Sequence, residues 1–580
     1  MTIHCKTRKL VSNTLSSKSP DLGPCSIEQY VAKKARFRVA PTNRIPVSWP
    51  HDDKTHRPST DRYGVFDNDL EEITKDALEK FGIEYRSAAV KKLTPQGFPA
   101  AEERTVIILT RETETDTTRW QEAVDYINEI IKDAAAQAGK KMDVELENYF
   151  ESYYDISSAI RPGTSIHKSF LQIEHVVETE VRRSCSGLWT SIAYHNRRHK
   201  FADSINVGFL SLTGVVEQPT VIVFVTPGSM AHWGEVEAQI CQAIEAAPFE
   251  EDVEIALEIL PGFNVPSIGP SAAYTPTTSK HPRYLDIEPV PTLGASIGPQ
   301  LSDTDSGSLG AVVNFQPRGG GEPRKCFLTS YRAVAPGDPI GRAVNDGLGI
   351  GLDGRSVVRQ RIEILYPACC DSEYTKDLLA KFAKENTSPK RSHYANLVAL
   401  IELEGVIGEV IHASGLRQSG SADRRHRMDW ALVALHPSKD AVLNIPPDDS
   451  KFYRPISRGV ESIFSYRAEP DDVISRTGDP VAFSWAGKFH IGPWGTAGRV
   501  NSMERTVCWG DGMVSKEIEV IPIDIEFAQG GDDGSMVFNA KKEWVGMVVG
   551  SDSEYAGYIT PTADIIADIE ARTGGTITLV

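Results

Sequence analysis

Hydrophobic positions in the first half of the chain form a pattern that occurs twice. A continuous apolar run lies at 105–110 and again at 220–226, and each is followed by an amphipathic helical stretch and a second run, at 142–146 and 253–257. Runs that are apolar at every position are typical of strands buried on both faces. The pattern predicts two related strand–helix–strand units in an α/β domain over residues 66–262.

A tryptophan opens the helix of each copy, at Trp120 and Trp233, and we expect both rings to anchor their helices to the sheet. One further helix is predicted before the first copy, at 68–81, where apolar residues recur at helical spacing and Gly82 provides a stop. Residues 1–65 show no sustained period and carry eleven Lys/Arg against four Asp/Glu within the first sixty, so we expect a mostly irregular basic segment.

The second half changes to short apolar runs separated by Gly and Asp turns, the pattern of an antiparallel sandwich or barrel. A Pro/Ser/Gly-rich linker or strap at 263–305 precedes it. A helix is inserted at 371–386, and another closes the chain, with Thr562 as N-cap and Gly574 as stop. The glycines of 318–321 favour a hairpin turn. The predicted strands are 309–315, 326–334, 397–403, 406–413, 430–435, 481–485, 518–525, 536–538 and 544–549.

Composition narrows the functional classes. The net charge of −17 argues against nucleic acid as a partner, and no apolar stretch is long enough to span a bilayer, so we expect no membrane partner. Eight cysteines without a Cys-x-x-Cys pair predict a reducing, intracellular and cytoplasmic setting, with Cys369 and Cys370 as packed thiols. The start of the chain lacks a signal-peptide core, although a mitochondrial presequence stays open. Metal-ligand spacing is missing, so no metal or cofactor is expected.

Three segments of the second half carry candidate chemistry. They are Cys-Phe-Leu-Thr-Ser-Tyr-Arg-Ala-Val at 326–334, Asp-Trp-Ala-Leu-Val-Ala-Leu at 429–435 and Gly-Asp-Asp-Gly-Ser at 531–535. In this order they resemble the histidine, aspartate and serine segments of the trypsin-like (chymotrypsin-fold) serine proteases. The segments 493–500 and 544–550 resemble the hairpin before the nucleophile loop and the strand beside the specificity pocket. The overall pattern is similar to trypsin-like domains of uncharacterised fungal intracellular proteins.

The resemblance implies a multidomain α+β chain, in which a chymotrypsin-like double β-barrel with a C-terminal helix occupies residues 306–580. It puts Arg332 at the histidine position, Asp429 at the aspartate position and Asp533 at the serine position, with the N–H groups of Gly531 and Asp533 as a vestigial oxyanion hole. Arginine stays protonated and aspartate has no hydroxyl, so two of the three catalytic positions are unfit for peptide hydrolysis.

Two arrangements of these residues stay open. Arg332 can bond both carboxylates in an ionic cluster, Asp429–Arg332–Asp533, because its planar fork offers several donors. Alternatively, Arg332 and Asp533 are exposed polar residues at positions that no longer matter. Replacement of the lost groups by His412, His426, His490 or Ser535 is not expected, and the basic run at 424–427 is interpreted as solvated loop charge, with a site for an acidic partner as the alternative.

The hypothesis for function is a catalytically inactive protease homologue, a pseudoprotease, that binds a peptide or protein ligand in the former substrate cleft or serves as a scaffold. One alternative is an active hydrolase of this fold that uses Asp533 as base or nucleophile. Another is that the N-terminal α/β domain carries the function and the barrel is structural.

Overall fold

The computed structural model describes residues 5–7, 23–35, 37–47, 51–55, 63–85, 87–95, 104–110, 116–137, 142–148, 155–199, 217–248, 253–265, 290–352, 360–384, 405–420, 425–439, 441–445, 473–489, 495–523, 527–528, 531–552 and 556–580. The chain divides into two compact units. One comprises Met1–Ser158, Gly163–Phe263 and Ser271–Pro276, and the other comprises Ala159–Pro162, Asn264–Pro270 and Thr277–Val580. The predicted boundaries at 65, 262 and 305 remain predictions, and strand 397–403 and His490 lie outside the described residues.

The first unit contains a five-stranded sheet in the order β3-β7-β6-β5-β4. The first repeat is present as β6, α3 and β7, with β6 and β7 parallel. Trp120 is buried among Val124, Ile127 and Val144, as expected for a ring that anchors its helix. The elements are β3 (Arg38–Val39), β4 (His51–Thr55), α2 (Tyr63–Lys80), β5 (Ser87–Pro95), β6 (Arg104–Thr110), α3 (Trp120–Gln137) and β7 (Met142–Glu147).

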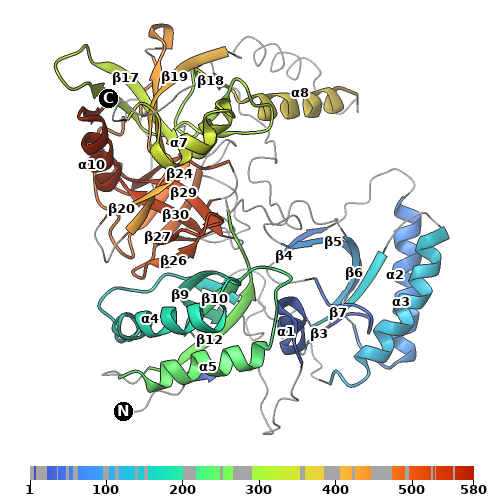
Figure 1. Cartoon of the computed structure of the whole chain (residues 1–580). Coiled ribbons are helices and arrows are strands. Elements are labelled where there is room, and N and C mark those ends of the chain that lie inside the picture. Colours follow the sequence, from blue (N-terminus) through green and yellow to red (C-terminus); the bar gives the residue numbers. More distant parts are fainter. Residues whose placement is uncertain are drawn as a thin grey trace. The chain divides into compact units, whose positions relative to one another are not determined.

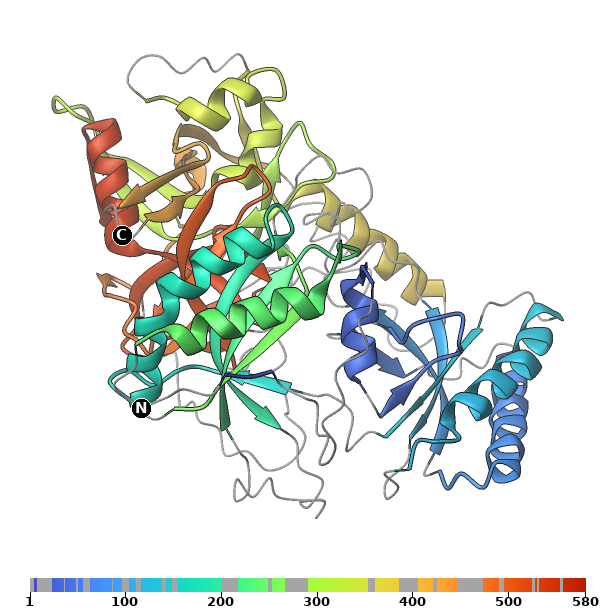
Figure 2. The same ribbon diagram turned by 60° about the horizontal axis from the view of Figure 1, so that its bottom comes forward.

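The second repeat builds a separate sheet of the same unit. Its β10 and β12 are parallel, with α5 between them in sequence, and β9 and β8 extend the sheet antiparallel. Figure 2 shows α4 and α5 side by side, and both helices pack on this sheet. The sequence pattern did not predict α4 or β9. The elements are β1 (Cys5–Thr7), β8 (Asp155–Ser158), α4 (Ser165–Ser184), β9 (Trp189–His199), β10 (Glu217–Val225), α5 (Trp233–Ala246) and β12 (Ile255–Pro261).

Part of the segment expected to be irregular is ordered. Strand β2 (Cys25–Ser26) pairs with β11 (Met230–Ala231), and α1 (Ile27–Lys34) follows with a capping box between Ser26 and Gln29. Trp233 donates from Nε1 to the carbonyl of Cys25, 2.9 Å away. The partners of this helix are about 200 residues away in sequence, which is why local periodicity did not reveal it.

The second unit contains two antiparallel β-barrel sheets, drawn in yellow to red in Figure 1. The first is a curled eight-stranded sheet in the order β15-β14-β18-β19-β22-β17-β16-β31. Its strands are β14 (Ser296–Pro299), β15 (Gly307–Ser308), β16 (Val312–Gln316), β17 (Arg324–Ser330), β18 (Glu363–Tyr366), β19 (Gly405–Ala413), β22 (Trp430–Leu435) and β31 (Thr576–Leu579). The Gly319–Gly320 turn between β16 and β17 confirms the predicted hairpin.

The second sheet closes on itself as a six-strand barrel, because β30 pairs with both β27 and β29. Its strands are β24 (Trp485–Phe489), β25 (Gly495–Val500), β27 (Val514–Pro522), β28 (Met536–Asn539), β29 (Glu543–Asp552) and β30 (Gly557–Pro561). Short strands β13 (Asn264–Val265), β23 (Arg476–Thr477) and β26 (Arg505–Cys508) pair at its margins, and β20 (Arg417–Gly420) forms a hairpin with β21 (Arg425–Met428). The two sheets give the double β-barrel that the resemblance implied.

Helices of this unit lie outside the barrels. They are α6 (Tyr331–Val334), α7 (Arg342–Leu348), α8 (Cys369–Lys384) and α10 (Thr562–Thr573). The inserted helix and the closing helix were both predicted, and Gly574 ends α10 in the left-handed conformation. The prediction for Thr562 was wrong, since Pro561 holds the N-cap position and the Thr562 hydroxyl donates instead to the Trp544 carbonyl at 3.0 Å.

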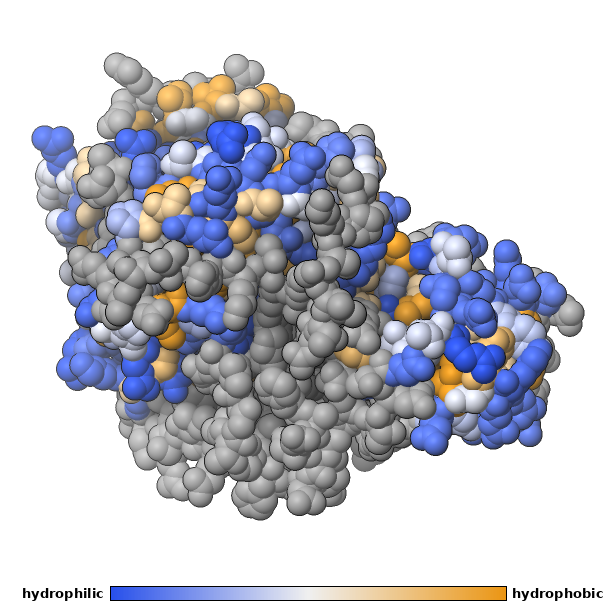
Figure 3. Space-filling model, turned by 90° about the horizontal axis from the view of Figure 1, so that it is seen from below, coloured by the Kyte–Doolittle hydropathy of each residue, from blue (hydrophilic) through white to orange (hydrophobic). Residues whose placement is uncertain are grey.

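Two expectations from composition concern the state of the cysteines and the presence of membrane-spanning helices. The cysteines whose side chains are described are all free thiols, including Cys369 and Cys370. Among the described helices, none combines the length and the apolar character required to cross a bilayer. Hydrophilic residues predominate over the described part of the face shown in Figure 3, with hydrophobic atoms in smaller groups between them.

Gly534 offers a test of how tightly the barrels pack near the candidate site. Its φ is +89°, and a Cβ there would lie 2.5 Å from Thr329 Oγ1, whereas Gly319 has a φ of +90° in open space. We expect Gly319→Ala to lower the free energy of unfolding by about 1–2 kcal/mol through backbone strain alone. Gly534→Ala should cost about 1–3 kcal/mol more because of the clash. Equal urea midpoints for the two variants would contradict this packing.

Candidate functional site

The end of β17 fixes the position of Arg332. Ser330 is the N-cap of α6, where its hydroxyl accepts from the Ala333 N–H at 3.2 Å. Tyr331 is buried, and its hydroxyl donates to Asp346 at 2.8 Å. The one-turn helix therefore leaves the strand at a defined angle, with Arg332 directed between the two barrels.

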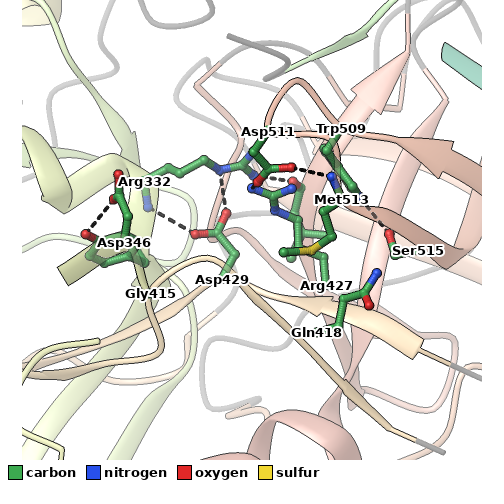
Figure 4. A network of polar contacts seen from close by, with 12 residues as sticks. Arg332, Asp346, Gly415, Gln418, Arg427, Asp429, Trp509, Asp511, Met513 and Ser515 are labelled. Carbon is green, nitrogen blue, oxygen red and sulfur yellow. Dashed lines mark hydrogen bonds and ion pairs between the residues drawn. The ribbon is translucent and has the colours of Figure 1, made fainter. Parts of the chain in front are cut away.

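Asp429 is the buried centre of the site. It lies between β21 and β22, its side chain has no exposed surface, and its Oδ1 accepts from the Arg332 backbone N–H at 3.1 Å. Arg332 Nε lies 2.5 Å from Asp429 Oδ2, so main chain and side chain of one residue hold both carboxylate oxygens (Figure 4). Such a charge-assisted pair is among the stronger polar interactions available in a protein interior.

Asp533 completes the group from the second barrel at a greater distance. Arg332 Nη2 donates to the carbonyl of Val549 and lies 3.9 Å from Asp533 Oδ2. The side chains of Arg332 and Asp533 are 11% and 15% exposed, so neither is a freely solvated surface group. The structure thus brings the three predicted residues together, with Arg332 bound closely to Asp429 and only loosely to Asp533.

A second buried ion pair holds the loop that carries Asp533. Lys488 Nζ on β24 lies 2.8 Å from Asp532 Oδ2, and the two side chains are 0% and 1% exposed. The Ser308 N–H donates to the Asp533 carbonyl at 3.0 Å, and the Ser308 hydroxyl donates to the Gly531 carbonyl at 3.1 Å. These contacts tie the loop to both barrels.

The oxyanion hole expected at Gly531 and Asp533 stays a prediction. Gly531 adopts a φ of +88°, a conformation that favours glycine. Within the described part of the chain, the N–H groups of Gly531 and Asp533 have no hydrogen-bond acceptor.

Burial shapes the proton affinity of both carboxyls. Burial raises the pKa of Asp429 above its ordinary value, and Arg332 and Arg427 work in the opposite direction. Burial also raises the pKa of Asp533 to about 6, with Arg332 lowering it and the nearby Asp429 and Asp532 raising it further. A carboxyl with this pKa exchanges protons near neutrality, which an ordinary surface aspartate does not.

Sequence analysis missed the role of Arg427. The interpretation of the basic run as solvated charge is wrong here, since Arg427 is 3% exposed while Arg425 is exposed. Its Nη2 lies 3.0 Å from Asp511, and its guanidinium lies 4.5 Å from the centre of the Trp509 ring (Figure 4). Burial lowers its pKa, as does the positive charge of Arg332. Strand alternation places Arg425 and Arg427 on the same face of β21, so the sequence pattern carried no signal that Arg427 is buried.

Arg332, Arg427 and Asp533 line a cavity of about 130 Å³. Three arginines, three aspartates and the Trp509 ring account for most of its polar and aromatic wall. The lining residues are Asp305, Ser306, Arg332, Ala333, Pro336, Arg342, Leu416, Arg427, Trp509, Gly510, Asp511, Gly531 and Asp533.

The other candidate residues lie elsewhere among the described residues. His426 is buried with Nδ1 3.9 Å from Glu517 and Nε2 3.7 Å from Asp564, and His412 packs edge-on against Phe315. Ser535 has no exposed surface. None of these lines the cavity, and no described cluster of His, Cys, Asp or Glu could hold a metal ion.

Comparisons with known proteins give only distant likeness. No family model matches this sequence, and the search of curated proteins found no match. Among solved structures, Protease A of Thermobifida fusca is 12% identical with a TM-score of 0.26, covering 50% of this chain and 100% of its own. A glutamic acid-specific serine protease is 13% identical with a TM-score of 0.25, and the match covers 50% of this chain and 100% of that protease. The chymotrypsin of Cellulomonas bogoriensis is 12% identical with a TM-score of 0.23, and the match covers 50% of this chain and 97% of the chymotrypsin.

The Lys488–Asp532 pair should dominate the stability of the loop. Lys488→Met leaves a buried carboxylate without this cation, and we expect it to lower the free energy of unfolding by about 3–5 kcal/mol. Adding Asp532→Asn should recover part of the loss. Lys541→Met, at an exposed lysine, is the matched control and should change stability by less than about 0.5 kcal/mol. A urea midpoint for Lys488→Met equal to that of the control would contradict the assignment.

Asp533 should make stability depend on pH with a defined sign. Its folded pKa of about 6 exceeds its ordinary value of 3.8, so the folded state binds a proton over this interval that the unfolded state has lost. Compared with Asp533→Asn, the natural protein should lose stability as pH rises from about 4 through 6, and the difference should level off above about 7. Urea unfolding of both proteins across this range provides the measurement, and a difference that grows with pH would refute the assignment.

Proposed function

We propose that the C-terminal unit is a catalytically inactive homologue of trypsin-like serine proteases, which binds a peptide or protein segment in its cleft. The observation that supports this most is the pairing of Arg332 with Asp429 at 2.5 Å. In a working site of this fold, the buried carboxylate orients an imidazole that takes a proton from the serine hydroxyl. Here its partner is a guanidinium, which stays protonated and cannot act as a base.

The residue at the nucleophile position supports the same proposal. Asp533 faces the cavity with a carboxyl instead of a hydroxyl, so a serine-type acyl intermediate cannot form on it. Its loop nevertheless keeps the anchoring contacts of Ser308 and the buried Lys488–Asp532 pair. A loop held in place without its reactive group is suited to binding rather than to turnover.

One observation favours a second candidate function. A carboxyl with a pKa of about 6 in a cavity has the proton affinity of a general acid or base that operates near neutrality. A hydrolase that uses Asp533 in this way would need no serine. The two functions predict opposite results in an assay of turnover.

Turnover and binding can be tested on the full chain. We expect no labelling by a fluorophosphonate probe and no hydrolysis of casein or of an activated ester. If the protein turns over a substrate and Asp533→Ala abolishes this activity, it is an active hydrolase, because the substitution removes the carboxyl that would act as the acid or base. Binding is measured with an array of short random peptides, from which a subset should be retained.

A cleft-blocking variant connects the binding to the site. Gly510 lines the cavity at an exposed position without a positive φ, so Gly510→Trp places a ring at the cavity with little strain. It should reduce affinity for the retained peptides by at least about tenfold, or about 1.4 kcal/mol. Gly405→Trp, outside the lining and in open space, is the control and should bind as the natural protein does. Equal affinities for both variants would place the binding elsewhere.

A further inference from the structure

The charges around the cavity are unevenly matched. Arg332 is held by Asp429 and by the carbonyl of Val549, and Arg427 is held by Asp511. Asp533 has only Arg332 Nη2, 3.9 Å away, and among the described residues no hydrogen-bond donor reaches its carboxylate. Arg332 and Arg427 each have a carboxylate closer than Asp533, and Asp533 itself lacks a close cation.

The accessible side of the cavity is correspondingly acidic. Asp511 is 35% exposed although it pairs with Arg427, and Asp305 is partly exposed on the same wall. The exposed cation of the lining, Arg342, is 3.9 Å from Asp346. Three carboxylates of the lining, Asp533, Asp511 and Asp305, thus have some exposed surface, against two cations, Arg342 and Arg332.

From this arrangement we infer that the cavity receives one basic side chain, lysine or arginine, of a partner peptide, with its cationic group against the carboxylate of Asp533. The inference rests on the proposed peptide-binding function and assigns its specificity. A cavity of about 130 Å³ has room for one side chain, since an apolar cavity of about 150 Å³ accommodates a benzene molecule. The Trp509 ring also lines the cavity, where it already contacts the guanidinium groups of Arg427 and Arg332.

An acidic ligand fits this site less well. Arg332 Nη1 and the Nε and Nη1 groups of Arg427 lack hydrogen-bond partners among the described residues, but all three atoms are shielded from solvent. A carboxylate could reach them only after rearrangement, and it would first lie against Asp533. An apolar side chain would remove Asp533 from water with only the distant Arg332 as a counter-charge, which is costly.

Proton binding should compete with the basic side chain. The groups that act on Asp533 are Arg332 and Arg427, which favour its ionised form, and Asp429 and Asp532, which oppose it, with Asp532 itself paired to Lys488. The pKa of about 6 means that the carboxyl is largely neutral at about pH 5 and ionised at about pH 7.5. The attraction of Asp533 for a cation should therefore be lost as the pH falls from about 7.5 to about 5.

The experiment uses the full chain and fluorescently labelled peptides retained on the array. Each peptide is made with lysine, arginine, norleucine or glutamate at one position in turn, and its affinity is measured by anisotropy. At one position, lysine and arginine should bind about tenfold more tightly than norleucine at about pH 7.5, with glutamate weakest. The advantage over norleucine should disappear at about pH 5.

Two variants identify the carboxylate. Asp533→Asn should remove the preference for the basic side chain while the norleucine peptide binds as before. Asp303→Asn changes an exposed carboxylate outside the lining and should leave the preference intact. Circular dichroism of both variants checks that they fold.

The possible results separate the inference from the function on which it rests. Peptides that bind in a Gly510-dependent manner, but equally well with lysine, norleucine and glutamate, would overturn the inference and leave the binding function in place. A preference for glutamate, or a basic preference that survives Asp533→Asn, would also overturn it. If no peptide binds, the result contradicts both the inferred preference for a basic side chain and the proposed binding function.

Discussion

The buried carboxylate of Asp429 is the constraint on which the candidate site depends. A carboxylate without exposed surface is costly unless a cation and hydrogen-bond donors compensate it, and Arg332 supplies the cation and a backbone N–H. A histidine at this position would provide a cation only when protonated, whereas arginine provides one at every accessible pH. Arg332 thus gives Asp429 a permanent counter-charge.

The same requirement explains why buried charges recur through the second barrel. Asp532 has Lys488, and the fully buried Arg505 lies between Glu519 at 2.8 Å and Asp552 at 2.5 Å. The side chain of Tyr558 and the carboxylates of Asp552 and Glu519 raise the pKa of Arg505 despite its burial. Among the residues that the structure describes, Glu517 has no ion pair this close, and burial raises its pKa to about 8, as expected for a carboxyl that stays largely neutral in the folded protein. Pairing or protonation therefore accompanies each of these acidic groups.

The carboxylate of Asp533 is only partly compensated by a cation, and this connects the structure with the proposed function. It is less buried than Asp429 and lies at the edge of Arg332's reach. An incompletely paired carboxylate at a cavity wall is tolerable when a proton or a ligand can neutralise it. In the proposed function, the carboxylate of Asp533 receives positive charge at this position, while the loop and the two barrels support it.

Sequence patterns determined the elements whose burial depends on near neighbours in the chain. The apolar runs at β6 and β10 implied parallel pairing through a helix, and the segments around Arg332, Asp429 and Asp533 implied the barrels and the order of the site. Helix α1 and the inward turn of Arg427 could not be predicted, because Trp509 and Glu237 cover them from far along the chain. Lys488 likewise looks like any strand lysine until Asp532 faces it. Periodicity is encoded locally, but whether a polar side chain is buried and paired is decided only when distant segments meet.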